Sequence, residues 1–285
     1  FGIRYEMLDA AELRYRFPQF AVADDDHAYF EPGAGYLKPE KCISVQLEMA
    51  RRSGASLHPG CRVHSVRSQG SGVQLTTDEG TVEAGIVAVC AGPWAGQLLG
   101  PPLDTALRPY RQTLHWYDLE DDWAEAWSRG PVFTWPHGSG GGDFFYGFPT
   151  LPGNRRVKVG TEGFVSQSDP DTVEAIDGDA ARKVHARHLK GRLSGLRSHG
   201  AISRSCMYTV TPDFHFAVGP VPAASNIWVV SACSGHGFKH APAVAEAVAA
   251  RLLQRETTLD LSSFSTSRLF ELPSEARDSN SGKPA

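Results

Sequence analysis

A ten-residue stretch near the end of the chain, residues 231–240 (SACSGHGFKH), has the composition of a ligand-binding turn. It follows the apolar run 226–230 and precedes a segment with apolar residues at helical spacing, so we expect a strand, a glycine turn and a helix. Gly235 and Gly237 permit a sharp bend and a close approach to a flat ligand. Lys239 adds a cation where a helix N-terminus would point its free N–H groups. These residues fit an anion site and a plain tight turn with a solvated lysine equally well.

Lys158 is a second residue whose surroundings suggest chemistry. It stands between two valines in residues 155–160 (RRVKVG), where the alternation predicts a strand with Arg156 and Lys158 on one face. If that face is the inner one, Lys158 is a buried cation, which is costly unless it has a purpose. If that face is the outer one, Lys158 is an ordinary surface lysine. The pattern alone leaves both readings open.

Composition and motifs exclude several classes of function. The formal net charge of −4 gives no basic footprint for a nucleic acid, and no apolar run approaches the roughly 20 residues that span a bilayer. The 11 histidines form no HExxH motif and the 5 cysteines form no CxxC pair, so we expect no metal site and reduced thiols in a cytoplasmic protein. The segment CSGHG departs from the GxSxG frame of serine hydrolases. A flavin site, formed by the AGPW turn at residues 91–94 and the SGHGFK turn, explains the most features.

The first hundred residues are expected to form two helices and a β-rich passage. The helices are predicted over residues 8–17 and 39–52, since Pro18 stops the first and Pro39 suits the first turn of the second. The apolar run 85–90 (GIVAVC) is typical of a central strand covered on both faces. The remaining elements expected here are a strand and turn at 28–37, strands at 61–66, 73–77 and 81–83, and a helix at 95–99.

Residues 103–217 alternate and are rich in aromatic side chains, which favours a mixed sheet. Strands are predicted at 112–119, 132–136, 144–148, 155–160 and 206–211, with a flexible glycine turn at 138–142. One or two charged helices are expected within residues 169–194. The tail at 273–285 is polar and is expected to be disordered.

Seven short stretches carry a family resemblance that covers nearly the whole chain. In family order they are FEPGAGYL (30–37), AGPWAGQLL (91–99), RPYRQ (108–112), YGFP (146–149), KVG (158–160), CMYTVTPDFHF (206–216) and SGHGFK (234–239). The chain resembles the monomeric sarcosine oxidase and N-methyltryptophan oxidase family, within the D-amino-acid-oxidase-like group of flavoenzymes. CMYT followed by SGHGFK at this spacing is the most specific pair.

The resemblance implies a role for each motif residue. Cys206 would carry a covalent link to FAD, Lys239 would hold the substrate carboxylate, and Tyr146 would line the pocket. Lys158 would sit near flavin N5 and activate oxygen, which implies the inner face. Glu162 replaces the histidine of sarcosine oxidases and would repel a substrate carboxylate or attract its amine. The other residues implied to contact FAD are Thr209, Gly235, His236, Gly237, Phe238, Val63, Gly92 and Trp94.

The implied fold class is α/β (mixed α+β), with an incomplete Rossmann-like FAD domain and a mixed-sheet substrate domain. The FAD domain is expected from residues 39–102 and 218–272, and the substrate domain from 1–38 and 103–217. The GxGxxG unit that opens the family does not occur in this sequence, so we expect that the chain starts late relative to the family.

The implied activity is FAD-dependent oxidation by oxygen of a secondary amine in an amino acid, giving an imine and hydrogen peroxide. The substrate would be sarcosine, another N-methyl amino acid or a cyclic imino acid, and the enzyme would be a monomer. Two alternatives remain open: a catalytically silent remnant or scaffold, and a flavin dehydrogenase that uses another electron acceptor.

Overall fold

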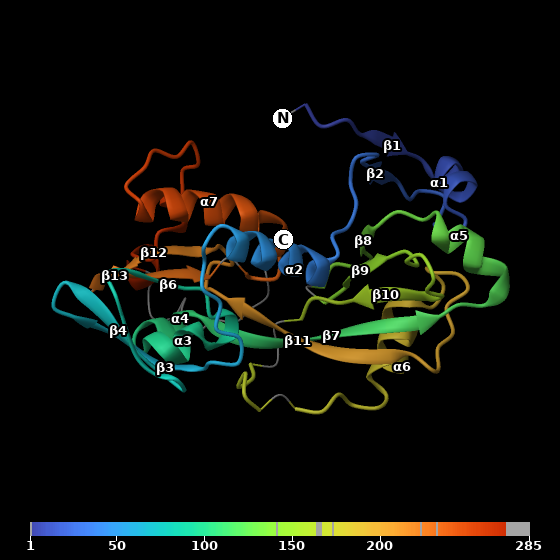
Figure 1. Cartoon of the computed structure of the whole chain (residues 1–285). Helices are drawn as coiled ribbons and strands as arrows, with labels where there is room; N and C mark the ends of the chain where they lie inside the picture. Colours follow the sequence, from blue (N-terminus) through green and yellow to red (C-terminus); the bar gives the residue numbers. More distant parts are fainter. Residues whose placement is uncertain are drawn as a thin grey trace.

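A computed structural model of the chain describes residues 2–140, 142–163, 167–172, 174–222, 224–231 and 233–271. Within these residues the fold is mixed α/β, with one five-stranded sheet, two three-stranded sheets and one two-stranded sheet. Figure 1 shows two lobes joined by a pair of long strands that run side by side through the middle of the molecule. The expected tail at 273–285 lies outside the described residues.

The five-stranded sheet is antiparallel and has the order β11-β7-β10-β9-β8. Its strands are β7 (Arg108–Asp118), β8 (Phe133–Pro136), β9 (Phe144–Phe148), β10 (Arg156–Gly160) and β11 (Ile202–Val210). All five expected strands occur here, although β7 and β11 each begin four residues before the predicted start. Because side chains alternate along a strand, Val157 and Val159 point into the larger hydrophobic core and Lys158 points to the opposite face.

Several short elements cover or connect the five-stranded sheet. They are η2 (Asp121–Trp123), α5 (Ala124–Ser128), α6 (Ala180–Val184) and the π-helix η3 (His185–Leu189). The helices predicted within residues 169–194 are therefore α6 and η3, which are shorter than the pattern suggested. The core on this face centres on Tyr117, Trp127 and Phe145, all fully buried.

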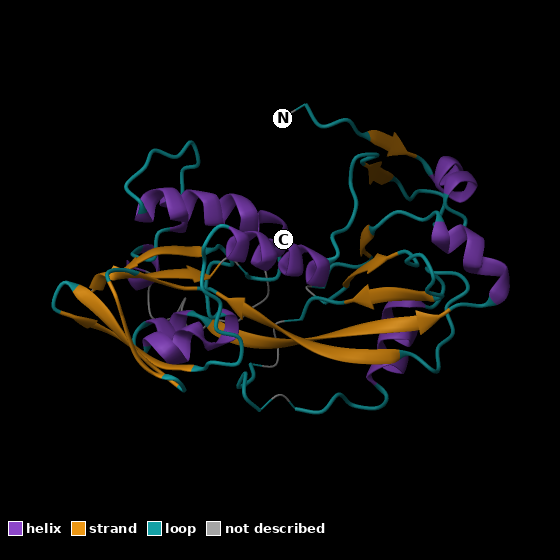
Figure 2. Ribbon diagram, in the orientation of Figure 1, coloured by secondary structure: helices purple, strands orange, loops and turns teal. Residues whose placement is uncertain are grey.

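A three-stranded sheet, β12 (Ala217–Val221), β13 (Ala224–Ser231) and β6 (Val87–Val89), forms the centre of the other lobe. Helix α7 (Ala241–Leu252) lies over it, and Val244, Ala247 and Val248 pack against the strand residues (Figure 2). The predicted order of strand, glycine turn and helix is confirmed. Residues 85–90 were expected to form a central strand, but β6 pairs only with β13 among the described strands and lies at the sheet edge.

The same lobe carries a meander and short helices. The meander is β3 (Val63–Gln69), β4 (Gly72–Thr77) and β5 (Gly80–Ala84), and the helical elements are η1 (Gly92–Trp94), α3 (Ala95–Leu99), α4 (Leu103–Ala106), η4 (Phe238–His240), η5 (Ser262–Phe264) and α8 (Arg268–Glu271). Helix α3 occupies the predicted range.

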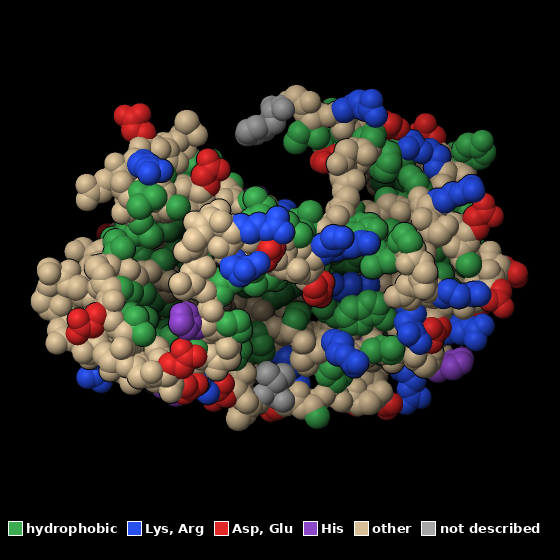
Figure 3. Space-filling view, in the orientation of Figure 1, with side chains coloured by type: hydrophobic (Ala, Val, Ile, Leu, Met, Phe, Trp, Pro, Cys, Tyr) green, Lys and Arg blue, Asp and Glu red, His purple; other side chains and the backbone are tan. Residues whose placement is uncertain are grey.

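The N-terminal part of the chain forms a small hairpin-like sheet and two helices. Strands β1 (Glu6–Leu8) and β2 (Ala28–Phe30) pair, and α1 (Ala10–Arg16) begins with a capping box in which the Asp9 and Glu12 carboxylates each accept the other residue's backbone N–H. Helix α2 (Pro39–Arg52) matches its prediction at both ends. No residue of α2 is buried, and hydrophobic side chains open to solvent lie beside it at the middle of the molecule (Figure 3).

Candidate functional site

The CMYT and SGHGFK motifs are packed against each other. The backbone N–H of Ser234 donates to the Thr209 carbonyl at 2.9 Å, which fastens the turn after β13 to strand β11. Gly235 has φ +84°, and a Cβ at this position would stand 2.8 Å from the Tyr208 ring. Only glycine allows both the left-handed backbone and the close ring. The CMYT and SGHGFK motifs, the two most specific stretches of the sequence, are therefore in direct contact.

Lys158 lies half-buried on the face of the five-stranded sheet away from the core. It pairs in register with Trp116 on β7 and Phe148 on β9, and its Nζ lies 5.4 Å and 5.0 Å from their ring centroids. Among the described residues it forms no ion pair. Burial lowers the pKa of Lys158, opposed by the charges of Cys206 and Glu40. Lys158 is therefore an unpaired, partly desolvated cation held between two aromatic rings.

Tyr146 and Tyr208 form a hydroxyl pair on the same face. Their oxygens are 3.3 Å apart, and burial raises the pKa of both. The Tyr146 ring lies over Gly160, where a Cβ would stand 2.6 Å from the tyrosine oxygen, so the glycine of the KVG motif makes room for this ring. Tyr208 was not singled out in the sequence. The signal was present, because Tyr208 stands two residues after Cys206 on a strand and so shares its face.

Cys206 lies half-buried opposite Gln112 of the neighbouring strand. Burial raises the pKa of its thiol, and the positive charge of Lys158 opposes this rise. The Cys206 thiol therefore lies within the electrostatic reach of the Lys158 ammonium group. Cys233 also raises the pKa of Cys206, so a second thiol lies in the same region, which the wide spacing of the cysteines in the chain did not indicate.

Glu162 lies two residues beyond Gly160, just after the end of β10. The Gln112 side chain donates to the Gly163 carbonyl at 2.6 Å and accepts from its N–H at 3.3 Å, which fixes the backbone beside Glu162. The half-buried Glu162 carboxylate contributes to the raised pKa of Tyr146 and of Tyr208. The structure thus brings Lys158, Glu162, Tyr146 and Cys206 together, next to the contact between Thr209 and the turn that holds Gly235.

Buried hydroxyl groups near these residues lack partners. The Oγ1 of Thr209 and the Oγ atoms of Ser205 and Ser231 are buried and form no hydrogen bond within the described part of the chain. Such groups are costly to leave unpaired, and they occur on β11 and at the end of β13, beside the glycine turn. Ser205 and Thr209 alternate with Cys206 and Tyr208 along β11 and so face the other side of the sheet, whereas Ser231 lies beside the glycine turn, where a polar ligand would satisfy its hydroxyl.

The remaining residues of the SGHGFK turn are arranged differently. Phe238 and Lys239 are exposed in η4, and Lys239 has no partner among the described residues. The His236 ring packs on Phe216 with a centroid distance of 4.9 Å, and Gly237 is buried before η4. The cation of Lys239 is therefore available at the start of α7, and no contact within the described ranges joins it to the tyrosine pair.

Val63, Gly92 and Trp94, which the resemblance implies to contact FAD, lie in the other lobe. Val63 opens strand β3, half-buried, and Gly92 begins η1 with φ +51°. The Trp94 indole N–H donates to the Asp171 carboxylate at 2.9 Å, and Arg62 pairs with the same carboxylate at 3.0 Å. The turn that holds Gly92 and Trp94 contacts β7 and β11, so it adjoins the sheet that carries Cys206.

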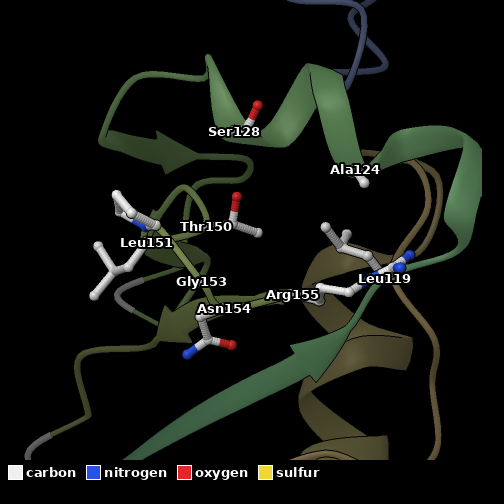
Figure 4. A pocket seen from close by; sticks show the side chains of 9 residues that line it. Leu119, Ala124, Ser128, Thr150, Leu151, Gly153, Asn154 and Arg155 are labelled. Carbon is white, nitrogen blue, oxygen red and sulfur yellow. The ribbon is translucent and has the colours of Figure 1, made fainter.

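The described residues meet the requirements of neither a metal cluster nor a membrane-spanning helix. No group of three or more histidine, cysteine, aspartate or glutamate side chains among them could hold a metal ion, and none of their helices could cross a bilayer. A crevice of about 190 Å³ lies between α5 and the turn at 150–155, with the Ser128 and Thr150 hydroxyls on its walls (Figure 4). None of the residues gathered around Lys158 lines it.

Comparison with known proteins identifies the family. Residues 1–251 match the family of FAD dependent oxidoreductases. The chain belongs to this family. Among curated members of this family, it is 32% identical over 277 residues to a monomeric sarcosine oxidase of Streptomyces avermitilis, covering 94% of this chain and 70% of that protein. It is 31% identical over 275 residues to an N-methyl-L-tryptophan oxidase of Salmonella arizonae, again covering 94% and 70%.

Solved structures of FAD dependent oxidoreductases share the fold. NikD, described as an unusual amino acid oxidase essential for nikkomycin biosynthesis, aligns with a TM-score of 0.74 at 23% identity, covering 92% of this chain and 68% of that one. Glycine oxidase from Geobacillus kaustophilus aligns with a TM-score of 0.69 at 21% identity, covering 94% and 68%. The expected family, the mixed α/β fold class and the assignment as an FAD-dependent oxidoreductase are confirmed.

Proposed function

We propose that the protein oxidises the secondary amine of an amino acid, sarcosine, another N-methyl amino acid or a cyclic imino acid, with oxygen as the acceptor and an imine and hydrogen peroxide as products. The observation that carries this proposal is the unpaired, half-buried Lys158 on the same sheet face as Cys206 and the tyrosine pair. The curated relatives named as oxidases of sarcosine and N-methyl-L-tryptophan support the class of substrate.

The residues present fit FAD. Thr209 holds the Gly235 turn through its backbone carbonyl, this turn allows close approach, the unpartnered Ser231 hydroxyl beside it suits a polar edge, and Lys158 and Lys239 can balance the negative charge of FAD. When bound, FAD supplies the two-electron acceptor that amino acid side chains lack. The other residues proposed to contact it are His236, Gly237, Phe238, Val63, Gly92 and Trp94. In this proposal residues 39–102 and 218–272 form the FAD domain, and residues 1–38 and 103–217 the substrate domain.

Cys206 is the proposed point of covalent attachment. Burial raises the pKa of its half-buried thiol, and the positive charge of Lys158 opposes that rise by stabilising the thiolate, which is the reactive form. Cys233 is the matched control, because it lies in the same region outside the CMYT motif. In this proposal, the flavin stays on the polypeptide in denaturing acid, Cys206→Ala releases it, and Cys233→Ala does not.

The chain's own residues divide the remaining work. Lys239 would bind the substrate carboxylate, since it is a free cation at the start of α7. The Tyr146 and Tyr208 hydroxyls would orient the substrate amine, and Glu162 beside them would favour a substrate that presents a positive charge at that end. Lys158 would hold a fixed positive charge near the place where oxygen gains negative charge.

The decisive experiment compares Lys158→Met with Lys183→Met in the purified, flavin-containing protein. Lys183 is exposed and paired with Asp177, so its variant controls for the loss of one lysine. We expect Lys158→Met to slow reoxidation by oxygen strongly while reduction by an N-methyl amino acid changes little, and Lys183→Met to alter neither. Stopped-flow absorbance separates the two half-reactions.

The alternatives give different outcomes in the same measurements. A purified protein without a flavin absorbance band would support the silent scaffold. A flavin that is reduced by substrate but reoxidised only by an added dye would support a dehydrogenase. Equal slowing of both half-reactions in Lys158→Met would refute the role proposed for this lysine.

A further inference from the structure

A second cavity lies apart from the flavin site and shares no residue with it. It has a volume of about 510 Å³ and lies between residues 21–26, the end of β8 at 135–137, and the turn at 190–192. Ligand pockets typically have volumes of roughly 300–1,000 Å³, so this groove can hold a small molecule. Neither the family match nor the relatives assign a role to these three segments.

Two permanent cations line this groove without a counter-ion. The Lys190 ammonium group has no partner among the described residues. The half-buried Arg192 donates only to the backbone carbonyl of His188, at 3.3 Å, and pairs with no described carboxylate. A guanidinium and an ammonium group on one wall produce a local positive potential that attracts anions.

Of the acidic side chains around the groove, Asp25 is exposed and outside its lining, and two others form ion pairs with arginines that do not line it. Asp24 pairs with Arg14 at 2.6 Å, and Asp143 pairs with Arg187 at 3.2 Å. Asp26, the acidic residue on the groove wall, accepts the backbone N–H of Ala23 at 2.7 Å through its carboxylate. The lining therefore carries one carboxylate and two cations, so its net charge is positive.

A pair of histidines adds a titratable donor. His137 lies on the wall, and its Nε2 is 2.8 Å from Nδ1 of His188, which is only 5% exposed. Burial lowers the pKa of both rings, and the charges of Arg192 and Arg187 lower them further while Asp143 opposes this. A bound anion would oppose the effect of these arginines, so protonation of the pair and anion binding would favour each other.

The groove is also held rigidly. The Ala21 N–H donates to the Arg192 carbonyl at 2.8 Å, which ties two of its three walls together. The third wall carries Trp135, whose ring stacks on Phe145 with a centroid distance of 5.8 Å. A fixed wall with charged donors and one aromatic surface needs little rearrangement to bind a ligand.

We propose that this groove binds a small molecule that carries a phosphate group, with the phosphate between Lys190, Arg192 and His137 and the organic part against Trp135. A phosphate offers several acceptor oxygens and about two negative charges, which matches three donors that approach from two walls. The cavity is larger than a phosphate ion, and this leaves space for the organic part.

The test is calorimetry on the purified full chain at low ionic strength, with inorganic phosphate and phenyl phosphate as probes. We expect both to bind, phenyl phosphate more tightly because its ring can contact Trp135. Lys190→Gln and Arg192→Gln should each weaken binding by roughly tenfold to a hundredfold, as expected for one lost charge-assisted contact. Lys183→Gln is the matched control. It should leave the affinity for both probes unchanged, because neither Lys183 nor its partner Asp177 lines the groove.

Sulfate tests the histidine pair separately, since it keeps two charges over the pH range in which phosphate titrates. We expect sulfate to bind more tightly at pH 5.5 than at pH 8 in the wild type, and His137→Gln to reduce this difference. Circular dichroism confirms that each variant is folded. Absence of phosphate binding to the wild type, or equal binding to the folded double variant Lys190→Gln/Arg192→Gln, would overturn the proposal.

Discussion

Replacement of Gly160 by alanine tests the geometry of the candidate site directly. A Cβ at this position would stand 2.6 Å from both Cζ and Oη of Tyr146 and 3.0 Å from Cδ2 of Leu114. Favourable carbon contacts are about 3.5–4.0 Å, so the tyrosine ring must withdraw by roughly 1 Å. That movement would stretch the 3.3 Å contact between the Tyr146 and Tyr208 hydroxyls.

The expected cost of Gly160→Ala follows from three contributions. Overpacking of this kind costs about 1–3 kcal/mol, and a lost hydrogen bond costs about 0.5–1.5 kcal/mol. Alanine is favoured over glycine within a strand by about 0.5–1 kcal/mol, which offsets part of this loss. We expect the free energy of unfolding to fall by about 1–3 kcal/mol, and Tm to fall by roughly 2–4 °C for each kcal/mol.

The assay is thermal and urea unfolding of Gly160→Ala, Tyr146→Ala and the double variant. If the Tyr146 ring causes the cost, the glycine substitution should cost about 1 kcal/mol less in the Tyr146→Ala background. Gly163→Ala is the control, because no atom of the described residues, apart from its chain neighbours, lies within 4 Å of its added Cβ. Equal costs in both backgrounds would show that Tyr146 does not lie over this glycine.

Three further predictions concern stability, pH and thiol reactivity. Gly235→Ala should lower the free energy of unfolding by about 1–2 kcal/mol or more, because its φ is +84° and its Cβ would meet Tyr208; urea unfolding measures this. Burial lowers the pKa of His115 to about 4 in the folded protein. As the pH falls, the unfolded chain therefore binds a proton at this histidine before the folded chain does, and the free energy of unfolding should decrease by about 3 kcal/mol between pH 6.5 and pH 4. His115→Gln should flatten that profile in urea titrations. In the flavin-free protein the Cys206 thiol should be alkylated by iodoacetamide more slowly in Lys158→Met than in the wild type, because the cation that favours the thiolate is lost; mass spectrometry gives the rates.

Local signals in the sequence were enough to place many elements. Helix α2 begins at Pro39, which suits a first turn, and ends before Ser53 and Gly54, and both ends were predicted. Strand β9 was also predicted at its observed bounds, Phe144–Phe148, because aromatic residues there alternate between the core and the opposite face. Each of these signals depends only on residues close in sequence.

The strand at residues 85–90 shows where such signals fail. A continuous apolar run indicates burial, but whether a strand is central depends on which other strands pair with it. Among the described strands β6 has one neighbour, β13, and the flanking Ile86 is 42% exposed. Hydrophobicity along the run could not supply this information.

The candidate site was predictable residue by residue but not as an arrangement. Period-two alternation placed Lys158 on one face of its strand, and the family motifs assigned it a role. The aromatic slot of Trp116 and Phe148 comes from cross-strand register, which no single segment encodes. Tyr208 meets Tyr146 across the face of the sheet although their strands β11 and β9 are not neighbours, and this contact cannot be read from either segment alone.

The position of Lys158 implies a trade between stability and function that can be measured without the cofactor. Its ammonium group is partly desolvated and forms no ion pair among the described residues; the attraction of two rings, worth about 0.5–2 kcal/mol, and the more distant charge of Glu40 offset part of that cost. Methionine has similar length and would pack between the same rings at no desolvation cost. We therefore expect Lys158→Met to leave the free energy of unfolding unchanged or to raise it by up to about 1 kcal/mol.

Because burial lowers the pKa of Lys158, the free energy of unfolding of the wild type should increase as pH rises toward 10.5, and the variant should lack this increase. Urea unfolding between pH 7 and 10.5 measures both effects. A loss of more than about 1 kcal/mol in the variant would mean that the charge itself stabilises the fold, and the reason to regard Lys158 as a functional cation would be gone.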